Sequence, residues 1–334
     1  MTMMPILWLK AKGKGTTGRA IAASAIRNRS HGFYFFISTL LAAPIILIWS
    51  RSSMVARSHS NALHSNKEIK VDEPPLNACA PRPGAEGEEQ QEKSSTASTS
   101  AWKSLTPVDI PNHYYKSQQG EDELLMGWFR NLCGGTYLEM GGLDGVLYSN
   151  SYVFNRALDW KGVLVELMSF NYEKLVANRP DEIARLNAGV CDESQTLHYY
   201  GTEEHSGAIG GIYEFSSPAF REMFWEDVAL DDPRVKEIRC DTLDSLLLEN
   251  APGTTFFDFF SLDVEGGELS VLRSIDFDRV SFGVIFFEVR GSQVLESMVA
   301  RLFLESKGYT FLFENQGSYW FANSNFHEIY KDLA

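Results

Sequence analysis

The sequence lacks the features of several common classes of protein. Its 334 residues carry 44 acidic side chains against 30 lysines and arginines, which gives a formal net charge of −14. Such a chain has no excess of cations to bind phosphates, so nucleic acid is not expected as a partner. The sequence also has no Cys-x-x-Cys pair, no cysteine paired with histidine at metal-ligand spacing, and no internal repeat. A cysteine-based metal module and a repeat protein are therefore not indicated.

Cysteine itself is scarce. The four cysteines are Cys79, Cys133, Cys191 and Cys240. In an oxidising compartment they would form one or two disulfides, but the sequence does not show which cysteines would pair. The alternative is that all four are unpaired, small, buried side chains.

One long uncharged run stands out near the N-terminus. Residues 32–49, GFYFFISTLLAAPIILIW, contain no charged side chain, and residues 1–31 contain six lysines and arginines but no acid. As a helix rising about 1.5 Å per residue, the run would reach roughly 27 Å, close to the thickness of a thin bilayer core. The positive-inside rule then predicts a cytosolic N-terminus and a lumenal remainder.

We therefore expect a single-pass type II membrane protein of the secretory pathway, in the Golgi or the endoplasmic reticulum, held in the membrane through residues 32–50. The main alternative is an organelle transit peptide, which fits the basic, acid-free start but fits the long uncharged run less well. A cleaved signal peptide would need an unusually long basic region before its apolar core. The only glycosylation sequon, Asn28-Arg29-Ser30, lies on the predicted cytosolic side and lends the lumenal arrangement no support.

The composition divides the chain into four parts. Residues 1–31 form a basic tail, 32–50 the anchor, 51–110 a polar segment, and 111–334 a domain. The polar segment is rich in Ser, Pro, Glu and Gln and is too poor in apolar side chains to bury a core. We interpret it as a disordered stalk between the anchor and the domain.

In the domain, short apolar runs of β-forming residues alternate with helical stretches. The runs are TYLEMGG, GVLVEL, ARLNAGV, FFDFFSLDV and FGVIFFEV. Continuous apolar strands between helices predict a mostly parallel sheet that is covered on both faces. The last two runs, YTFLFEN and SYWFAN, are so close together that they predict an antiparallel hairpin. The expected fold class is α/β, a doubly wound sheet that ends in this hairpin.

Four carboxylates stand at the ends of the predicted strands. Glu139 lies in the first strand, Glu166 closes the second, Asp192 follows the third and Asp263 ends the fourth. Doubly wound sheets bind their ligands beyond the carboxyl ends of the strands, near the topological switch point. The four acids together predict a ligand site at this edge.

The turn after the first strand, GGLDG, favours a ligand without a pyrophosphate. Gly141, Gly142 and Gly145 let the backbone approach a ligand closely. However, Leu143 replaces the middle glycine of a dinucleotide motif, and Asp144 would repel phosphate. An acid about 20 residues beyond such a turn is placed to accept hydrogen bonds from a ribose, and Glu166 has this spacing. A cationic nucleoside such as S-adenosylmethionine fits this pattern better than a nicotinamide dinucleotide.

Three stretches carry a family resemblance. They are YLEMGGLDGVLYSN, then DWKGVLVEL with NYEKLVANRP, then CDTLDSLL followed by DFFSLDVEGGELSVL. In this order they resemble the FkbM-type family of S-adenosylmethionine-dependent methyltransferases over roughly residues 130–325, and within it the membrane-anchored Star-like branch. The resemblance implies the Rossmann-like fold of class I methyltransferases, with S-adenosyl-L-methionine as the cofactor.

The resemblance also implies a role for each acid at the predicted edge. The methionine part of the cofactor would contact Glu139, Gly141 and Asp144, the ribose Glu166, the adenine amino group Asp192, and the transferable methyl group Asp263. The activity it implies is O-methylation of a glycan or a small hydroxylated metabolite. Ser261 departs from the family, because many members carry lysine there. A catalytically inactive Star-like membrane protein, acting in trafficking or binding, is therefore the alternative.

Three further expectations concern nearby side chains. His205, in the loop EEHSGAIGG, is a candidate general base for an acceptor hydroxyl, although an exposed loop histidine without a role is the alternative. Glu265 and Glu268 are expected to stabilise the positive end of the helix that they open. No metal site is predicted from spacing, although Asp263, Glu265 and His205 could meet in space.

Overall fold

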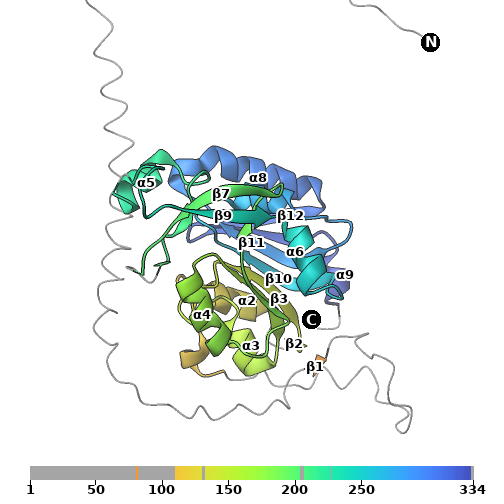
Figure 1. Ribbon diagram of the computed structural model, residues 1–334. Coiled ribbons are helices and arrows are strands. Elements are labelled where there is room, and N and C mark those ends of the chain that lie inside the picture. The colour runs from red at the N-terminus through yellow and green to blue at the C-terminus, as the bar shows by residue number, and fades with distance from the viewer. Residues whose placement is uncertain (1–79, 82–109, 130–131, 204–206, 227, 332–334) are drawn as a thin grey trace, which may run out of the picture. The chain divides into compact units, whose positions relative to one another are not determined.

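The computed structural model describes residues 80–81, 110–129, 132–203, 207–226 and 228–331 (Figure 1). The predicted tail and anchor, nearly all of the predicted stalk, and His205 lie outside the described residues. Within the described residues, no helix combines the length and the apolar character that a bilayer span requires.

A seven-stranded sheet is the centre of the domain (Figure 1). Its strands are, in spatial order, β12 (Tyr309–Asn315), β13 (Ser318–Asn323), β11 (Ser281–Glu288), β10 (Phe256–Leu262), β3 (Thr136–Met140), β4 (Lys161–Glu166) and β5 (Ala184–Asn187). From β11 to β5 the neighbouring strands are parallel, whereas β13 is antiparallel to both β11 and β12. The predicted doubly wound α/β sheet and its C-terminal hairpin are both confirmed.

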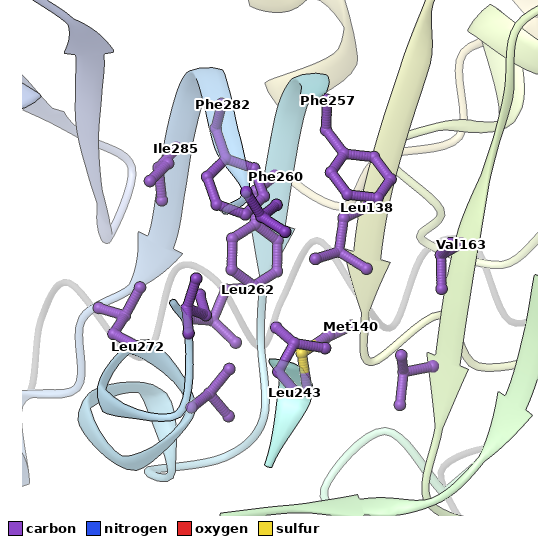
Figure 2. Close-up of a cluster of buried hydrophobic side chains, with 14 of the residues drawn as sticks. Leu138, Met140, Val163, Leu243, Phe257, Phe260, Leu262, Leu272, Phe282 and Ile285 are labelled. Atoms are coloured by element: carbon purple, nitrogen blue, oxygen red, sulfur yellow. The ribbon is translucent and has the colours of Figure 1, made fainter. Parts of the chain in front are cut away.

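Helices cover the two faces of this sheet because its side chains alternate between them. Leu138 and Phe260 pack on one face with residues of α6 (Leu243–Asn250), α7 (Glu268–Arg273) and α8 (Val294–Ser306). Figure 2 shows part of this core. Tyr137 and Phe259 pack on the other face with residues of α2 (Glu121–Phe129), α3 (Tyr152–Leu158) and α4 (Ser169–Asn178).

Smaller elements complete the described fold. They are a parallel pair, β1 (Ala80–Pro81) and β2 (Leu132–Cys133), the 3-10 helices η3 (Asn112–Tyr114) and η5 (Gly291–Gln293), α5 (Pro218–Phe224) and α9 (Phe326–Ile329). A separate four-stranded sheet has the order β6 (Gly189–Val190), β9 (Lys236–Asp241), β7 (Gln195–Tyr200) and β8 (Gly211–Ile212).

The separate sheet corrects the prediction that ARLNAGV forms one strand of the main sheet. The chain leaves the main sheet after Asn187 and pairs again as β6, parallel to β9. Gly189 permits this pairing, because a Cβ there would lie only 3.2 Å from the Cβ of Cys240. The prediction placed one strand where the structure has two, in different sheets.

A disulfide joins β9 to the residue that follows β6. Cys191 and Cys240 are bonded, with their Cα atoms 5.8 Å apart, and Cys133 is disulfide-bonded as well. Of the two alternatives that the sequence left open, disulfides are therefore found for these three residues and unpaired cysteines are not.

Replacing both Cys191 and Cys240 with alanine is expected to lower the free energy of unfolding by about 2 to 4 kcal/mol. The bond joins residues 49 apart in the sequence, so its loss lets the unfolded chain occupy many more conformations. Urea unfolding of the variant and the parent chain measures the difference. An unchanged transition midpoint would contradict the prediction.

Candidate active site at the carboxyl ends of β3, β4 and β10

Three neighbouring strands end in the same row. Met140 pairs with Leu262 of β10 and with Val165 of β4. The next residues of the three strands are Gly141, Asp263 and Glu166, so the sheet brings these predicted site residues to one edge. The chain proceeds from β3 outward to β4 and β5, and later from β10 outward on the other side to β11. The chain therefore reverses its direction across the sheet between the neighbouring strands β3 and β10. This is the topological switch point, where doubly wound folds bind ligands.

Gly141 is at the centre of this row. Its φ is +82°, a left-handed conformation that suits glycine. Its N–H donates to the carbonyl of Val165 at 3.0 Å, and the N–H of Asp263 donates to the carbonyl of Met140 at 3.2 Å. A Cβ on Gly141 would lie 2.0 Å from the main-chain oxygen of Asp263. The glycine is needed for the close approach of β3 and β10, in addition to any approach to a ligand.

The other two predicted glycines are packed against α4 and its end. A Cβ on Gly142 would lie 3.3 Å from a side-chain carbon of Leu175. Gly145, with a φ of +78°, would place a Cβ 2.7 Å from Cγ of Arg179. The turn therefore lies directly on α4, and both glycines allow this packing.

Asp144 shapes its own loop. Its Oδ1 accepts hydrogen bonds from the N–H groups of Val146 at 2.9 Å and Leu147 at 2.7 Å. Within the described residues its other carboxylate oxygen accepts no hydrogen bond, so this oxygen is available to a ligand. A contact between Asp144 and the methionine part of the cofactor stays a prediction.

Glu139 is buried beneath the same loop. Its carboxylate accepts hydrogen bonds from the N–H of Asn150 at 2.6 Å, from the hydroxyl of Ser149 at 3.0 Å, and from the hydroxyl of Ser151. The pKa of Glu139 is raised above its usual value because the carboxyl group is buried, and the nearby positive charge of Arg179 only partly offsets this effect. In this structure Glu139 fixes the loop that borders the edge, and its direct contact with a cofactor stays a prediction.

Arg179 connects these parts and was missed from the sequence. It is fully buried and pairs with Glu182 at 2.8 Å. Its guanidinium also donates to the hydroxyl of Tyr137 at 2.6 Å, to the hydroxyl of Ser151 at 2.9 Å and to the carbonyl of Gly145 at 2.9 Å. No motif with a fixed spacing identifies this arginine, because its partners are spread over more than 40 residues of sequence. It lies within NYEKLVANRP, a stretch that carries the family resemblance.

Glu166 is buried at the end of β4. One carboxylate oxygen accepts a hydrogen bond from the N–H of Leu143 at 2.9 Å, and the other accepts from the N–H of Met168 at 2.7 Å. A carboxylate has about four acceptor positions, so two remain for ribose hydroxyls. Burial raises the pKa of Glu166 from 4.5 to about 7.

This raised pKa predicts a pH dependence of stability. Between about pH 4.5 and 7 the unfolded chain releases the Glu166 proton while the folded chain keeps it. The free energy of unfolding is therefore expected to fall as the pH rises through this window, and Glu166 should add no further slope above it. Glu166→Gln has no such proton and should remove up to about 1.4 kcal/mol per pH unit of this slope. Urea unfolding across the window tests this, and equal slopes for the two proteins would contradict it.

Asp192 and Asp263 are both exposed, but they differ in position. Asp263 directly follows β10 in the row described above. Asp192 follows β6 of the separate sheet, and its N–H donates to the hydroxyl of Ser270 at 3.0 Å. The expectation that all four acids end strands of one sheet is wrong for Asp192. Its contact with an adenine stays a prediction.

Ser261 is the residue at which the family resemblance leads a lysine to be expected. It is buried in β10, and the side-chain amide of Asn150 donates to its hydroxyl at 2.8 Å.

Glu265 and Glu268 differ from one another. Glu268 accepts hydrogen bonds from the N–H groups of Val264 and Gly266, both at 3.2 Å, and so stabilises the turn that precedes α7. Its effect on the positive end of the helix stays a prediction. Glu265 has a φ of +62° and contacts Arg290, so its predicted role at the helix end is wrong. Arg290 lies just after the end of β11, so the sequence around Glu265 could not predict this ion pair.

Comparison with known proteins identifies a family. Residues 139–311, more than half of the chain, match the family described as the methyltransferase FkbM domain. A search of curated proteins found no match.

Among solved structures, the chain is similar to a TehB-like S-adenosylmethionine-dependent methyltransferase from Corynebacterium glutamicum, at 13% identity over 61% of this chain and 88% of that one, with a TM-score of 0.34. It is also similar to fibrillarin from Aeropyrum pernix with natively bound S-adenosyl-L-methionine, at 11% identity over 63% of this chain and 76% of that one, with a TM-score of 0.33. These superpositions are loose, so the family assignment rests on the match to residues 139–311. The chain belongs to the FkbM methyltransferase family and is an S-adenosylmethionine-dependent methyltransferase.

Proposed function

We propose that this chain binds S-adenosyl-L-methionine at the edge formed by β3, β4 and β10 and directs its methyl group to the oxygen of a hydroxylated acceptor. The observation that carries the proposal is the row of Gly141, Glu166 and Asp263 at the topological switch point of an FkbM domain.

The residues of this row fit the cofactor. Gly141 is exposed at the edge of the sheet, so a ligand can reach its backbone. Glu166 keeps acceptor positions for two ribose hydroxyls. Asp263 is exposed, and its negative charge suits a ligand with a positive sulfur. When bound, the cofactor supplies a methyl group on a positively charged sulfur, and an acceptor oxygen takes that group as it loses its proton.

The protein's own contribution would be to position the reactants and to manage this proton. Fixed sites for cofactor and acceptor convert the encounter into an internal reaction, which is a large part of the rate enhancement of many enzymes. Two side chains are candidates to receive the hydroxyl proton. One is Asp263 at the end of β10, and the other is His205, which lies outside the described residues.

The proposed acceptor is a glycan or a small hydroxylated metabolite, in the lumen of the secretory pathway. The disulfides support an oxidising compartment. We propose that residues 1–31 are cytosolic and that residues 32–50 anchor the chain, with residues 51–110 as a stalk that bears the domain. Digestion of residues 111–334 by protease added to sealed microsomes would contradict this topology.

The second candidate function is that of a Star-like membrane protein that binds partners or acts in trafficking without turnover. Ser261 favours it, because the lysine of many family members is replaced by a buried hydroxyl. The two functions differ in their dependence on Asp263.

Transfer of labelled methyl from S-adenosyl-L-methionine to a panel of glycans and hydroxylated metabolites tests the proposal. Asp263→Ala is expected to lower the rate of transfer at least about 100-fold, the usual effect of removing a group that moves a proton. Glu314→Ala, an exposed residue of β12, is the matched control and should leave the rate unchanged. A cellular phenotype that survives Asp263→Ala intact would favour the binding or trafficking function.

A further inference from the structure

Helix α8 exposes a concentration of apolar side chains (Figure 1). Of the twelve large hydrophobic side chains that are exposed in the described residues, this one helix carries five: Val294, Leu295, Met298, Val299 and Leu302. Leu295 is 75% exposed and Leu302 is 62% exposed. A single exposed apolar side chain is ordinary on a protein surface, but a contiguous group of them usually marks an interaction site.

The spacing of these five residues places them on one face of the helix. Counted from Val294, they recur at i+1, i+4, i+5 and i+8, which is the period of a single helical face. The residues that α8 buries against the domain, Ser297, Ala300 and Leu304, lie on the opposite face. The helix therefore has two apolar faces, and only one of them is packed against the described part of the chain.

The exposed face has the size and the surroundings of an interface core. The exposed parts of its five side chains come to roughly 400 Å² of apolar surface, about half of the ~800 Å² that each partner buries in a standard interface. Charged residues of the same helix, Glu296, Arg301 and Glu305, flank the face. An apolar centre with a polar rim is the usual composition of a protein–protein interface.

The order of residues along this face is the same in both directions. Leu295 precedes the central pair, Met298 and Val299, by three residues, and Leu302 follows the pair by three. If two copies of α8 packed antiparallel about a two-fold axis at this centre, Leu295 of one copy would lie opposite Leu302 of the other. The central residues would then meet their own copies. A two-fold interface requires a self-complementary surface of this kind, so the pattern favours a second copy of the chain as the partner.

The charges of α8 do not favour a lipid surface. Helices that lie on membranes are rich in lysine and arginine on their polar face. The only charged residues of α8 are Glu296, Arg301 and Glu305, which together give one negative charge. The whole chain is also strongly acidic, with a formal net charge of −14.

We propose that the exposed face of α8 binds a second copy of the chain, in a dimer whose two α8 helices pack antiparallel about a two-fold axis at Met298 and Val299. The proposal does not depend on the proposed function, because no residue of α8 belongs to the row at the ends of β3, β4 and β10.

Sedimentation velocity of the full-length chain in a mild detergent tests the proposal. We expect a dimer with a micromolar or tighter dissociation constant. Leu295→Glu combined with Leu302→Glu should raise this constant at least about 100-fold, because it removes apolar contacts and brings like charges together across the interface. Both positions are exposed and glutamate is a good helix former, so the variant should keep the near-ultraviolet circular dichroism of the parent chain.

Leu295→Glu combined with Leu302→Lys tests the antiparallel arrangement. It introduces charges at the same two positions, but the two-fold axis would place each acid opposite a base of the other copy. We expect this variant to dimerise at least about tenfold more tightly than the variant with two glutamates. Equal weakening by the two variants would overturn the antiparallel pairing.

Leu230→Glu combined with Leu248→Glu is the matched control. These leucines are 46% and 49% exposed and lie outside α8, so the variant should dimerise like the parent chain. A parent chain that stays monomeric at about 100 μM would overturn the proposal. A dimer that survives Leu295→Glu with Leu302→Glu would also overturn it and would assign the contact to another surface. If a monomeric chain loses stability in that variant, another segment of the same chain covers the face instead.

Oxidative crosslinking gives a second, independent measurement. The two-fold axis places Met298 beside its own copy, so Met298→Cys should form a disulfide between two chains and appear as a covalent dimer on a non-reducing gel. Met223→Cys replaces a methionine of α5 that is 65% exposed and should remain monomeric. The parent chain gives the background from the native cysteines. No more covalent dimer from Met298→Cys than from Met223→Cys would contradict the arrangement.

Discussion

Replacing Arg179 with methionine is expected to lower the free energy of unfolding by about 3 to 5 kcal/mol, the usual cost of removing one partner of a buried ion pair. The substitution keeps most of the apolar volume but leaves Glu182 buried without its cation. It also removes the hydrogen bonds to Tyr137, Ser151 and the carbonyl of Gly145. Urea unfolding, followed by tryptophan fluorescence, measures the loss.

A matched control separates burial from loss of charge. Arg301→Met removes a guanidinium that pairs with Glu305 on the exposed face of α8. Surface pairs of this kind contribute about 1 kcal/mol or less. Equal losses of unfolding free energy in Arg179→Met and Arg301→Met would show that the buried network does not hold the glycine turn. Because this network supports the loop beside the proposed site, Arg179→Met should also weaken cofactor binding.

Replacing Gly141 with alanine is expected to weaken binding of S-adenosyl-L-methionine at least about 100-fold, which corresponds to roughly 2.7 kcal/mol. The new Cβ would lie 2.0 Å from the main-chain oxygen of Asp263, so either the turn or the end of β10 must move. Both carry residues of the proposed cofactor site. Calorimetric titration of the variant with the cofactor measures the effect.

Gly308→Ala controls for backbone strain. Gly308 has a φ of +88°, close to the +82° of Gly141, but a Cβ there would have no atom within 4 Å. Alanine in this conformation costs about 1 to 2 kcal/mol of stability by itself. We expect Gly308→Ala to lose stability and to keep full cofactor affinity. Unchanged affinity in Gly141→Ala would show that the cofactor does not depend on the contact between β3 and β10.

The main sheet could be predicted because its signals are local. The strands β3, β4, β10 and β11 are continuous apolar runs, and the hairpin of YTFLFEN and SYWFAN has the predicted bounds in β12 and β13. Once the strands are parallel, their carboxyl ends must share one edge, which placed Glu166 and Asp263 in the same row as Gly141.

The remainder depended on contacts between distant parts of the sequence. Asp192 was misplaced because β6 has only two residues and is defined by its pairing with β9, about 50 residues later. Arg179 looks like an ordinary basic residue after a helix until its buried partners are known. The contact of Glu265 with Arg290 was not considered, since it forms only when β11 lies next to β10. Local patterns contain none of these long-range pairings.

Calorimetric binding of S-adenosyl-L-methionine and S-adenosylhomocysteine to the full-length chain, with Glu166→Ala alongside, tests the central claim most directly. We expect micromolar affinity for both ligands in the parent chain and no measurable binding by the variant, with both proteins folded by near-ultraviolet circular dichroism. Absence of binding by the folded parent chain, or equal binding by Glu166→Ala, would contradict a cofactor site at the ends of β3, β4 and β10.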